Sequence, residues 1–480
     1  MEKITRRKMT GAMVAAAVSL PAAAQAQFDW LPRQGGGGRG RGRACIHIDP
    51  ENPAILYNRM NCEMCGDCIA VCKNIQTVYG FGSPNETFCT WCGQCVANCW
   101  NNGLTEKFSL PSVQDAMAKN RKTRKKTFVA ITSPAVRVAI GEMFQMPPGT
   151  NMQGQVVSAL RSVGFDYVFD VSFGADLTTM EEAHELTEML RTNDSVRPLF
   201  SSCCPSWVRF AEKFFPKYVP YISTCKSPIL MQGAMIKTYF AKKKNLDPRD
   251  IVVVAIAPCT AKKGEITLPD AYAAGKLCGV EKMPDVDFAL TTRELGWWLM
   301  EEKKTLAELE SDTCDSITGQ DSGSGVIFGN TGGVTESVLR TVAYNITGKK
   351  PLANFLNLAP VRGLDGLRKA EVRIGEYKIR VGIVHGLGVI REVFKVLDAL
   401  KFDFVEVMAC RGGCIGGGGQ PKSEIPLSDD LRAKRIRGLY ETDQNHAIRF
   451  SYENPEIQRV YLDDLGKPGS EKAVKRLHTI

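Results

Sequence analysis

The sequence holds 17 cysteines, and most of them fall into spaced motifs that could bind metal. Two stretches, CEMCGDCIAVCKN and CTWCGQCVANCWN, share the spacing C-x2-C-x2-C-x3-C. Three cysteines in a tight loop can reach three corners of one 4Fe–4S cubane, and the fourth ligates the other cluster of a pair. The spacing therefore predicts two clusters. One is held by Cys62, Cys65, Cys68 and Cys99, and the other by Cys89, Cys92, Cys95 and Cys72.

This spacing is that of a two-cluster bacterial ferredoxin. It predicts that residues 45–110 form a small α+β domain that transfers electrons through two 4Fe–4S clusters. Zinc held by the same thiolates is the alternative, and eight cysteines at this spacing favour iron–sulfur clusters over it.

Three later cysteine motifs lie far apart in the sequence, each at the end of an apolar run. They are FSSCCPSW (200–207), APCTAKKGE (257–265) and EVMACRGGCIGGGGQP (406–421). Ligands gather beyond the carboxyl ends of strands in open parallel sheets, so three such loops can converge on one buried site. Together they offer four thiolates for another cubane, from Cys204, Cys259, Cys410 and Cys414.

Cys203 and Cys204 are adjacent, and adjacent side chains on an extended backbone point to opposite faces. If Cys204 ligates the cubane, Cys203 points elsewhere and needs a different role. The glycines around Cys414 allow the backbone to pack closely where a Cβ would collide.

From Thr127 onward, short apolar runs alternate with helical stretches, which is typical of an α/β fold with buried parallel strands. The expected strands are 127–132, 166–171, 251–257, 287–292, 380–386 and 404–409, with an amphipathic helix at 179–192. We therefore expect a catalytic domain, residues 127–429, of two parallel or mixed sheets with flanking helices around a buried metal site. Residues 430–480 are expected to wrap its outside as helices and extended arms.

Two N-terminal segments precede these domains. Residues 1–26 combine a twin arginine, a short apolar stretch and small residues before Gln27, the layout of a twin-arginine signal peptide. This predicts export of the folded protein to the periplasm by the twin-arginine translocase. Residues 27–44 form a Gly/Arg-rich linker, and without interleaved aromatic residues it is not expected to bind nucleic acid.

The composition fits a large globular protein, with 480 residues, 44% of them hydrophobic, and a formal net charge of +9. No uninterrupted apolar run reaches the length of about 18 residues that a membrane span needs. Export favours disulfides, but an odd number of cysteines in tight clusters favours metal ligation. Four cysteines outside the motifs are expected to be small buried side chains: Cys45, Cys225, Cys278 and Cys314.

The three late motifs closely resemble the signature motifs of iron-only (FeFe) hydrogenases, which read T-S-C-C-P-x-W, M-P-C-x-x-K-x-x-E and E-x-M-A-C-x-x-G-C-x-x-G-G-G-Q-P. The resemblance runs from about Cys62 to the C-terminus, and the whole chain resembles a fused periplasmic type with a ferredoxin domain. It implies reversible activation of hydrogen, giving protons and electrons, at an H-cluster. In that cofactor a 4Fe–4S cubane is joined through one cysteine sulfur to a di-iron unit with CO, cyanide and a dithiolate.

The resemblance also implies roles for single residues. The four late cysteines hold the cubane, and Cys414 bridges it to the di-iron unit. Lys262 donates to one cyanide, which suits an ammonium beside a bound anion, and Met408 flanks the bridging carbonyl. Ser133 and Pro134 begin the loop around the other cyanide.

A proton path is implied as well. Cys203 begins it, because a thiol is a weak acid with a reference pKa of about 8.5. Glu182 and Glu185 share one helical face, and Ser223 supplies a hydroxyl. The implied order is Cys203, Glu182, Ser223 and Glu185. Without the resemblance, the two glutamates would be interpreted as surface carboxylates.

Four residues depart from those usual in the family around the expected di-iron unit. They are Ser201, Ala257, Ile229 and Ala135. Groups around a metal cofactor tune its potential, so these departures bear on catalytic bias and inhibitor sensitivity rather than on the presence of the cofactor.

Two alternatives remain. A hydrogenase-like iron–sulfur assembly protein would hold a cubane without the di-iron unit, but it would not need Cys203, Lys262 or the export signal. A hydrogen sensor usually carries an appended signalling domain, for which residues 430–480 are short. Export favours hydrogen uptake, with electrons passed to a carrier such as a periplasmic cytochrome or ferredoxin, and the cofactor requires maturation proteins.

Overall fold

The computed structural model describes residues 45–80, 88–192, 198–352, 355, 357–422 and 428–479. The predicted signal peptide, residues 1–26, and the linker, residues 27–44, lie outside these ranges. Within them, no helix combines the length and the hydropathy needed to cross a bilayer.

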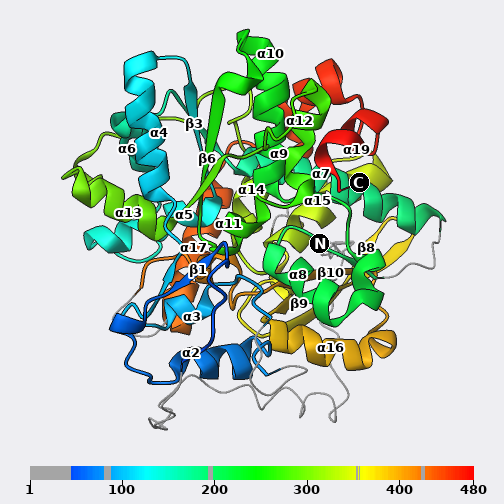
Figure 1. The fold of residues 1–480 in the computed structure, drawn as a ribbon. Helices are drawn as coiled ribbons and strands as arrows, with labels where there is room; N and C mark the ends of the chain where they lie inside the picture. Colours follow the sequence, from blue (N-terminus) through cyan, green and yellow to red (C-terminus); the bar gives the residue numbers. More distant parts are fainter. Residues whose placement is uncertain are drawn as a thin grey trace, which may run out of the picture.

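Two four-stranded sheets form the centre of the fold (Figure 1). The first is parallel throughout, in the order β4 (Tyr167–Asp170), β3 (Thr127–Thr132), β6 (Ile251–Ala257) and β7 (Phe288–Thr291). The second is mixed, in the order β5 (Leu199–Phe200), β10 (Phe404–Met408), β9 (Tyr377–His385) and β8 (Leu367–Ile374). All six predicted strands are present, and the prediction of two parallel or mixed sheets is confirmed. The sequence interpretation missed β5 and the antiparallel edge strand β8.

Helices cover both faces of the first sheet, because successive side chains of a strand point to opposite faces. Phe128 and Ala130 of β3 pack in one core, whereas Val129 and Ile131 pack in another. The first core is closed by α4 (Leu110–Thr123), α6 (Gln153–Val163) and α13 (Thr292–Glu301). The second is closed mainly by α9 (Pro228–Met235) and the helical turn that continues it, Ile236–Phe240.

The second sheet is covered in the same manner. Phe404 and Met408 of β10 pack toward α7 (Ser172–Thr192) and α15 (Gly333–Thr347). Val405 and Val407 pack toward α8 (Pro205–Phe214) and α16 (Leu387–Leu400). The two faces of this sheet thus have separate cores; Cys203 packs in the first, and Cys204 packs against both.

The helix α7 differs from the prediction. It begins at Ser172 rather than Thr179, and it is buried along most of its circumference, including Glu181 and Glu182. An amphipathic helix was expected. The reason for the difference is that α7, besides covering the second sheet, also contacts α9, α15 and α14 (Gly323–Val326), so it is buried between several elements.

The N-terminal cysteine-rich segment is a small unit in which β1 (Ile55–Tyr57) pairs antiparallel with β2 (Leu104–Glu106). Its short helices, α2 (Asp67–Ala70) and α3 (Gln94–Ala97), begin after Gly66 and Gly93, which have left-handed backbone angles. Figure 1 shows this blue segment beside the orange and yellow C-terminal half of the catalytic part.

The C-terminal segment is helical, as expected, with α17 (Asp429–Asn445), α18 (Pro455–Val460) and α19 (Glu471–Leu477). It is more than an outer wrap. The ion pair between Arg340 of α15 and Asp443 of α17, 2.9 Å long, is fully buried. Asp176 of α7 accepts hydrogen bonds from Ser451 and Asn454 at 2.7 and 2.9 Å. Buried polar groups of the segment therefore complete the interior.

Candidate active site

Four cysteines converge where β5, β6 and β10 end. Cys204 follows β5 and caps α8, and Cys259 lies between β6 and α11 (Ala261–Glu265). Cys410 follows β10, and Cys414 begins the next helical turn. Burial, with the charge of Cys204 adding to it, raises the pKa of Cys259 and Cys414 to about 12. Burial also raises the pKa of Cys410 well above its ordinary value, and the charges of the other three cysteines add to it. The structure thus brings all four predicted ligands together.

Glycines allow the loops around this group to pack backbone against backbone. Gly413 has a φ of +87°, and a Cβ there would lie 2.7 Å from the backbone nitrogen of Thr331. A Cβ on Gly418 would lie 2.4 Å from the carbonyl oxygen of Cys92. The close packing predicted around Cys414 is therefore present, and part of it is with the N-terminal cysteine segment.

The four thiols fit an iron–sulfur cubane. None of them forms a disulfide, and none is exposed. A buried thiol ionises readily only beside a compensating positive charge, and iron bound to thiolates supplies one. The donor set and its surroundings are therefore those of a metal centre rather than of a hydrophobic core.

Cys203 and Cys204 have different surroundings. Cys203 packs within the core shared by α7, α15 and Met408, whereas Cys204 lies at the border of this core and of the core on the other face of the sheet. The Cys204 sulfur accepts the backbone N–H of Ala409 at 3.5 Å. Lys262 is buried, and its Nζ donates to Glu265 Oε2 at 2.8 Å and to the Cys203 carbonyl at 3.4 Å. Lys262 therefore places an ammonium beside the backbone of Cys203.

The loop after β3 forms another part of the surroundings. Ser133 caps α5 (Pro134–Arg137), which begins at Pro134, and its N–H donates to the Ile256 carbonyl at 2.9 Å. Ser133 and Pro134 are both buried. The departing residue Ala135 is fully buried too, and its carbonyl accepts from Gln420 of the last cysteine motif at 2.9 Å.

The predicted proton path lies in one region, but it is not a continuous chain of hydrogen bonds. Glu182 Oε1 accepts from the N–H of Ser202 at 3.1 Å, and Ser223 Oγ accepts from Cys225 N–H at 3.2 Å. Among the described residues, no direct hydrogen bond joins the four members. Glu182 Oε2 and Glu185 Oε2 are buried without a partner there, so each has a free acceptor for a water or a hydroxyl.

Glu182 is a fully buried carboxyl rather than a surface one. Burial raises the pKa of Glu182 to about 8, and the charge of Glu185 adds to the effect. Such a group exchanges protons near neutral pH, as a relay member must. Burial also raises the pKa of Cys203 well above its ordinary value, with the charge of Glu182 adding to it. The two groups are thus close enough to influence each other.

A pH-dependent stability difference should follow from Glu182. Because its folded-state pKa lies above the unfolded value, the folded protein binds the extra proton, and wild-type stability falls as pH rises from about 4.5 to about 8. Glu182→Gln carries no such proton. The melting temperature of Glu182→Gln minus that of wild type should therefore increase over this range. Anaerobic thermal melts at pH 5, 7 and 9 measure it, and a constant difference would contradict the raised pKa.

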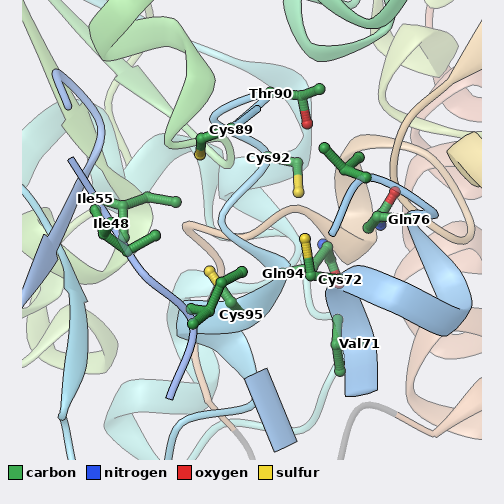
Figure 2. A pocket seen from close by; sticks show the side chains of 12 residues that line it. Ile48, Ile55, Val71, Cys72, Gln76, Cys89, Thr90, Cys92, Gln94 and Cys95 are labelled. Carbon is green, nitrogen blue, oxygen red and sulfur yellow. The ribbon is translucent and has the colours of Figure 1, made fainter. Parts of the chain in front are cut away.

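One of the two predicted N-terminal cysteine sets lines a common pocket. Figure 2 shows Cys72, Cys89, Cys92 and Cys95 around it, the set predicted from the exchange of the fourth cysteine between repeats. Of the other set, Cys68 and Cys99 belong to the small core of this segment, which also contains members of the first set. Cys65 is exposed, so this group lies toward the surface.

Two features of this segment were missed from the sequence. Gln94 Nε2 donates to the Cys410 sulfur at 3.2 Å and to the Gly416 carbonyl at 2.9 Å, which ties the inner cysteine group to the four late cysteines. Cys45 was expected to be an ordinary buried side chain, but its sulfur lies 3.7 Å from that of Cys68. Neither contact has a sequence signal, because each depends on how distant loops pack.

The remaining cysteines outside the motifs differ in burial. Cys225 is buried, as expected, and Cys314 is partly buried. Cys278 was expected to be buried and is exposed, because it ends the short helix α12 (Ala273–Cys278) at the surface.

Comparison with known proteins identifies the family. The profile of the iron-only hydrogenase large subunit, C-terminal domain, matches residues 126–418, and that of the iron hydrogenase small subunit matches residues 429–480. The chain belongs to the iron-only hydrogenase family. This hydrogenase is 36% identical over 452 residues to iron hydrogenase 1 of Clostridium pasteurianum, covering 90% of this chain and 76% of that one. It is 39% identical over 449 residues to the NADP-reducing hydrogenase subunit HndD of Solidesulfovibrio fructosivorans, covering 89% and 74%.

Solved structures agree with the sequence relatives. An apo variant of the FeFe hydrogenase HydA1 from Chlamydomonas reinhardtii is similar with a TM-score of 0.66 and 37% identity, covering 76% of this hydrogenase and 98% of that chain. A more distant relative is the cytosolic iron-sulfur assembly component 3 of Mus musculus, 30% identical over 77% of each chain. The matches to hydrogenases make this protein an oxidoreductase of the hydrogenase class.

Proposed function

We propose that this enzyme oxidises hydrogen at an H-cluster and passes the electrons through two 4Fe–4S clusters to a redox partner. The observation that carries the proposal is the presence of a fifth thiol at the active site. Beside the four cysteines at the strand ends, Cys203 packs in the core of α7 and α15, near Glu182. A plain electron carrier has no use for a fifth thiol placed beside a buried acid.

Cys204, Cys259, Cys410 and Cys414 would hold the cofactor, with Cys414 as the bridge to the di-iron unit. When bound, that unit supplies the metal centre at which hydrogen is split. The residues of the chain manage charge and protons. Lys262 keeps a buried ammonium near Cys203, and the Cys203 sulfur takes up or releases a proton. Glu182, Ser223 and Glu185 carry it outward, with water at the unpartnered carboxylate oxygens.

The electron route is supported by contacts between the cysteine groups. Burial raises the pKa of Cys410, the charges of Cys259 and of Cys92 in the inner group add to it, and Gln94 Nε2 donates to the Cys410 sulfur directly. The outer group reaches the surface at Cys65, beside the exposed side chains of Met60 and Met64. We propose that the electron carrier, a periplasmic cytochrome or a ferredoxin, docks on this side.

Export by the twin-arginine translocase is part of the proposal. The signal in residues 1–26 supports it, since this route carries folded proteins with their cofactors in place. Maturation proteins would insert the di-iron unit before export, and a periplasmic location favours hydrogen uptake over hydrogen production.

The assembly-protein alternative has a specific basis in the identity to the mouse assembly component. The features that favour the hydrogenase are Cys203, Lys262 and buried Glu182, which a protein without turnover does not require. A hydrogen sensor would share these residues and differ in turnover rate.

Metal content and turnover test the proposal together. Protein made without maturation factors should hold three 4Fe–4S clusters, about twelve irons, because the eight N-terminal and four late cysteines form independent sites. Full maturation should add about two irons, infrared bands from CO and cyanide, and rapid hydrogen-dependent reduction of a viologen dye. Matured protein that lacks the infrared bands would indicate the assembly protein, and bands with only sluggish turnover would indicate the sensor.

A further inference from the structure

Three side chains that commonly ligate metals meet where the C-terminal segment packs on α7. They are Glu185, Cys225 and His478, and their oxygen, sulfur and nitrogen atoms lie within 4.8 Å of one another. Glu185 belongs to α7, Cys225 precedes α9, and His478 follows α19. The backbones of Cys225 and His478 form an isolated antiparallel bridge, which holds the two residues opposite each other.

The donor set has the chemistry of a zinc site. Thiolate, imidazole and carboxylate are the ligands that Zn²⁺ takes in proteins, at about 2.0–2.3 Å from the metal. His478 Nδ1 and Glu185 Oε1 are 3.6 Å apart, a separation that two ligands of one tetrahedral ion can span. Glu185 Oε2 is buried and has no hydrogen-bond partner among the described residues, so this carboxylate still has an acceptor to satisfy.

The other ring nitrogen of His478 is held as in many metal sites. Nε2 lies 3.1 Å from Glu181 Oε2, and Glu181 is fully buried. This carboxylate also accepts from the Tyr461 hydroxyl and the Gly469 N–H. Because a carboxylate only accepts, the proton of the imidazole is drawn to Nε2, and Nδ1 is left with its lone pair. A carboxylate behind a histidine in this manner orients the ring and strengthens it as a metal ligand.

Thr224 leaves the Nδ1 lone pair of His478 available. Its hydroxyl donates to Glu185 Oε1 at 2.6 Å and lies 2.7 Å from His478 Nδ1. A hydroxyl has one proton, so while it donates to Glu185 it does not donate to Nδ1. The lone pair of Nδ1 is then free to bind a cation.

We propose that Glu185, Cys225 and His478 form a binding site for Zn²⁺, with Glu181 supporting His478. The Glu185 side chain is 20% exposed, so an ion can reach the site from solvent. Glu185 is also the outermost member of the proton path in the proposed function, on which the following consequence rests. Zinc bound to this carboxylate occupies the group that must exchange protons with solvent, and hydrogen turnover falls as the site fills.

Zinc binding tests the site without reference to catalysis. Matured enzyme with its full iron content is dialysed anaerobically against Zn²⁺ buffered by a chelator, and bound zinc is counted by atomic emission. Wild type should hold one tightly bound zinc that Cys225→Ala and His478→Gln lose. Glu181→Gln should bind it about 10–100-fold more weakly. Cys278→Ser, which removes an exposed cysteine elsewhere, is the matched control and should keep it.

Substitutions of buried residues can disturb folding. Glu185→Gln, at a partly exposed position, is therefore the second variant. Iron content and melting temperature identify the samples that are intact. Zinc retained by intact His478→Gln and Glu185→Gln would overturn the site. Dye-linked hydrogen oxidation with and without zinc then tests the consequence, with inhibition expected in wild type and lost in His478→Gln. Zinc that binds without slowing turnover would contradict the inhibition, whereas matured enzyme inactive even without zinc would contradict the proposed function.

Discussion

Replacing Cys203 by alanine should lower hydrogen turnover by about 10²–10⁴-fold, the range that general acid–base groups contribute, while the infrared bands of CO and cyanide persist. Cys203 packs in the same core as Met408 and lies near Glu182, and it is not one of the four cofactor cysteines. Its thiol can therefore be removed without removing a ligand. Dye-linked hydrogen oxidation and infrared spectra of the same sample measure the two effects.

Cys314→Ala is the matched control, because Cys314 is a partly buried cysteine outside the site. It should keep both the bands and the turnover. Glu182→Gln should behave as Cys203→Ala does, since an amide keeps the shape of the carboxyl but cannot carry the proton. Near-normal turnover in Cys203→Ala with the bands intact would mean that protons leave by another path.

Replacing Cys414 by alanine should abolish the di-iron unit altogether. Cys414 is the implied sulfur bridge between the cubane and the di-iron unit. Cys204, Cys259 and Cys410 are committed to the cubane, and Cys203 is assigned to the proton path. The expected result is loss of all CO and cyanide bands and of all hydrogen turnover. Infrared spectra and iron analysis of matured protein measure it.

Substitutions in the N-terminal cysteine groups provide the contrast. Cys62→Ala or Cys89→Ala should keep the infrared bands and slow electron transfer to a protein partner, because these thiols belong to the relay. If these variants lost the bands and Cys414→Ala retained them, the assignment of the two parts of the chain would be wrong.

Much of the fold could be predicted because its signals are local. The strands β3, β6 and β10 are apolar runs of the length that a buried parallel strand requires, and β6 and β10 each lead directly into a cysteine motif. The strand β8 was not predicted from the sequence because it lies at a sheet edge and carries charged residues. The alternation of Ala370, Val372 and Ile374 with charged residues was a signal that could have been used.

The parts of the site that could not be predicted depend on packing between distant segments. The spacing of the cysteines indicates which thiols gather, but it does not indicate that Gln94 reaches Cys410 from 316 residues away. In the same way, the sequence of α7 was interpreted as an amphipathic helix, and that interpretation did not indicate that Glu182 is buried. The burial of Glu182 follows from the central position of α7. Long-range contacts of this kind leave no periodic pattern in the amino-acid sequence.

The buried polar contacts of residues 429–480 have a consequence for how the enzyme tolerates dilution. Arg340 with Asp443, and Asp176 with Ser451 and Asn454, join the parts that match the large- and small-subunit profiles. Two separate proteins would give up translational and rotational freedom to form such contacts, and the complex would dissociate at low concentration. In one chain the contacts form at an effective concentration set by the short connection between the two parts. Their occupancy is therefore independent of how much protein is made, and the two parts are always present in equal amounts.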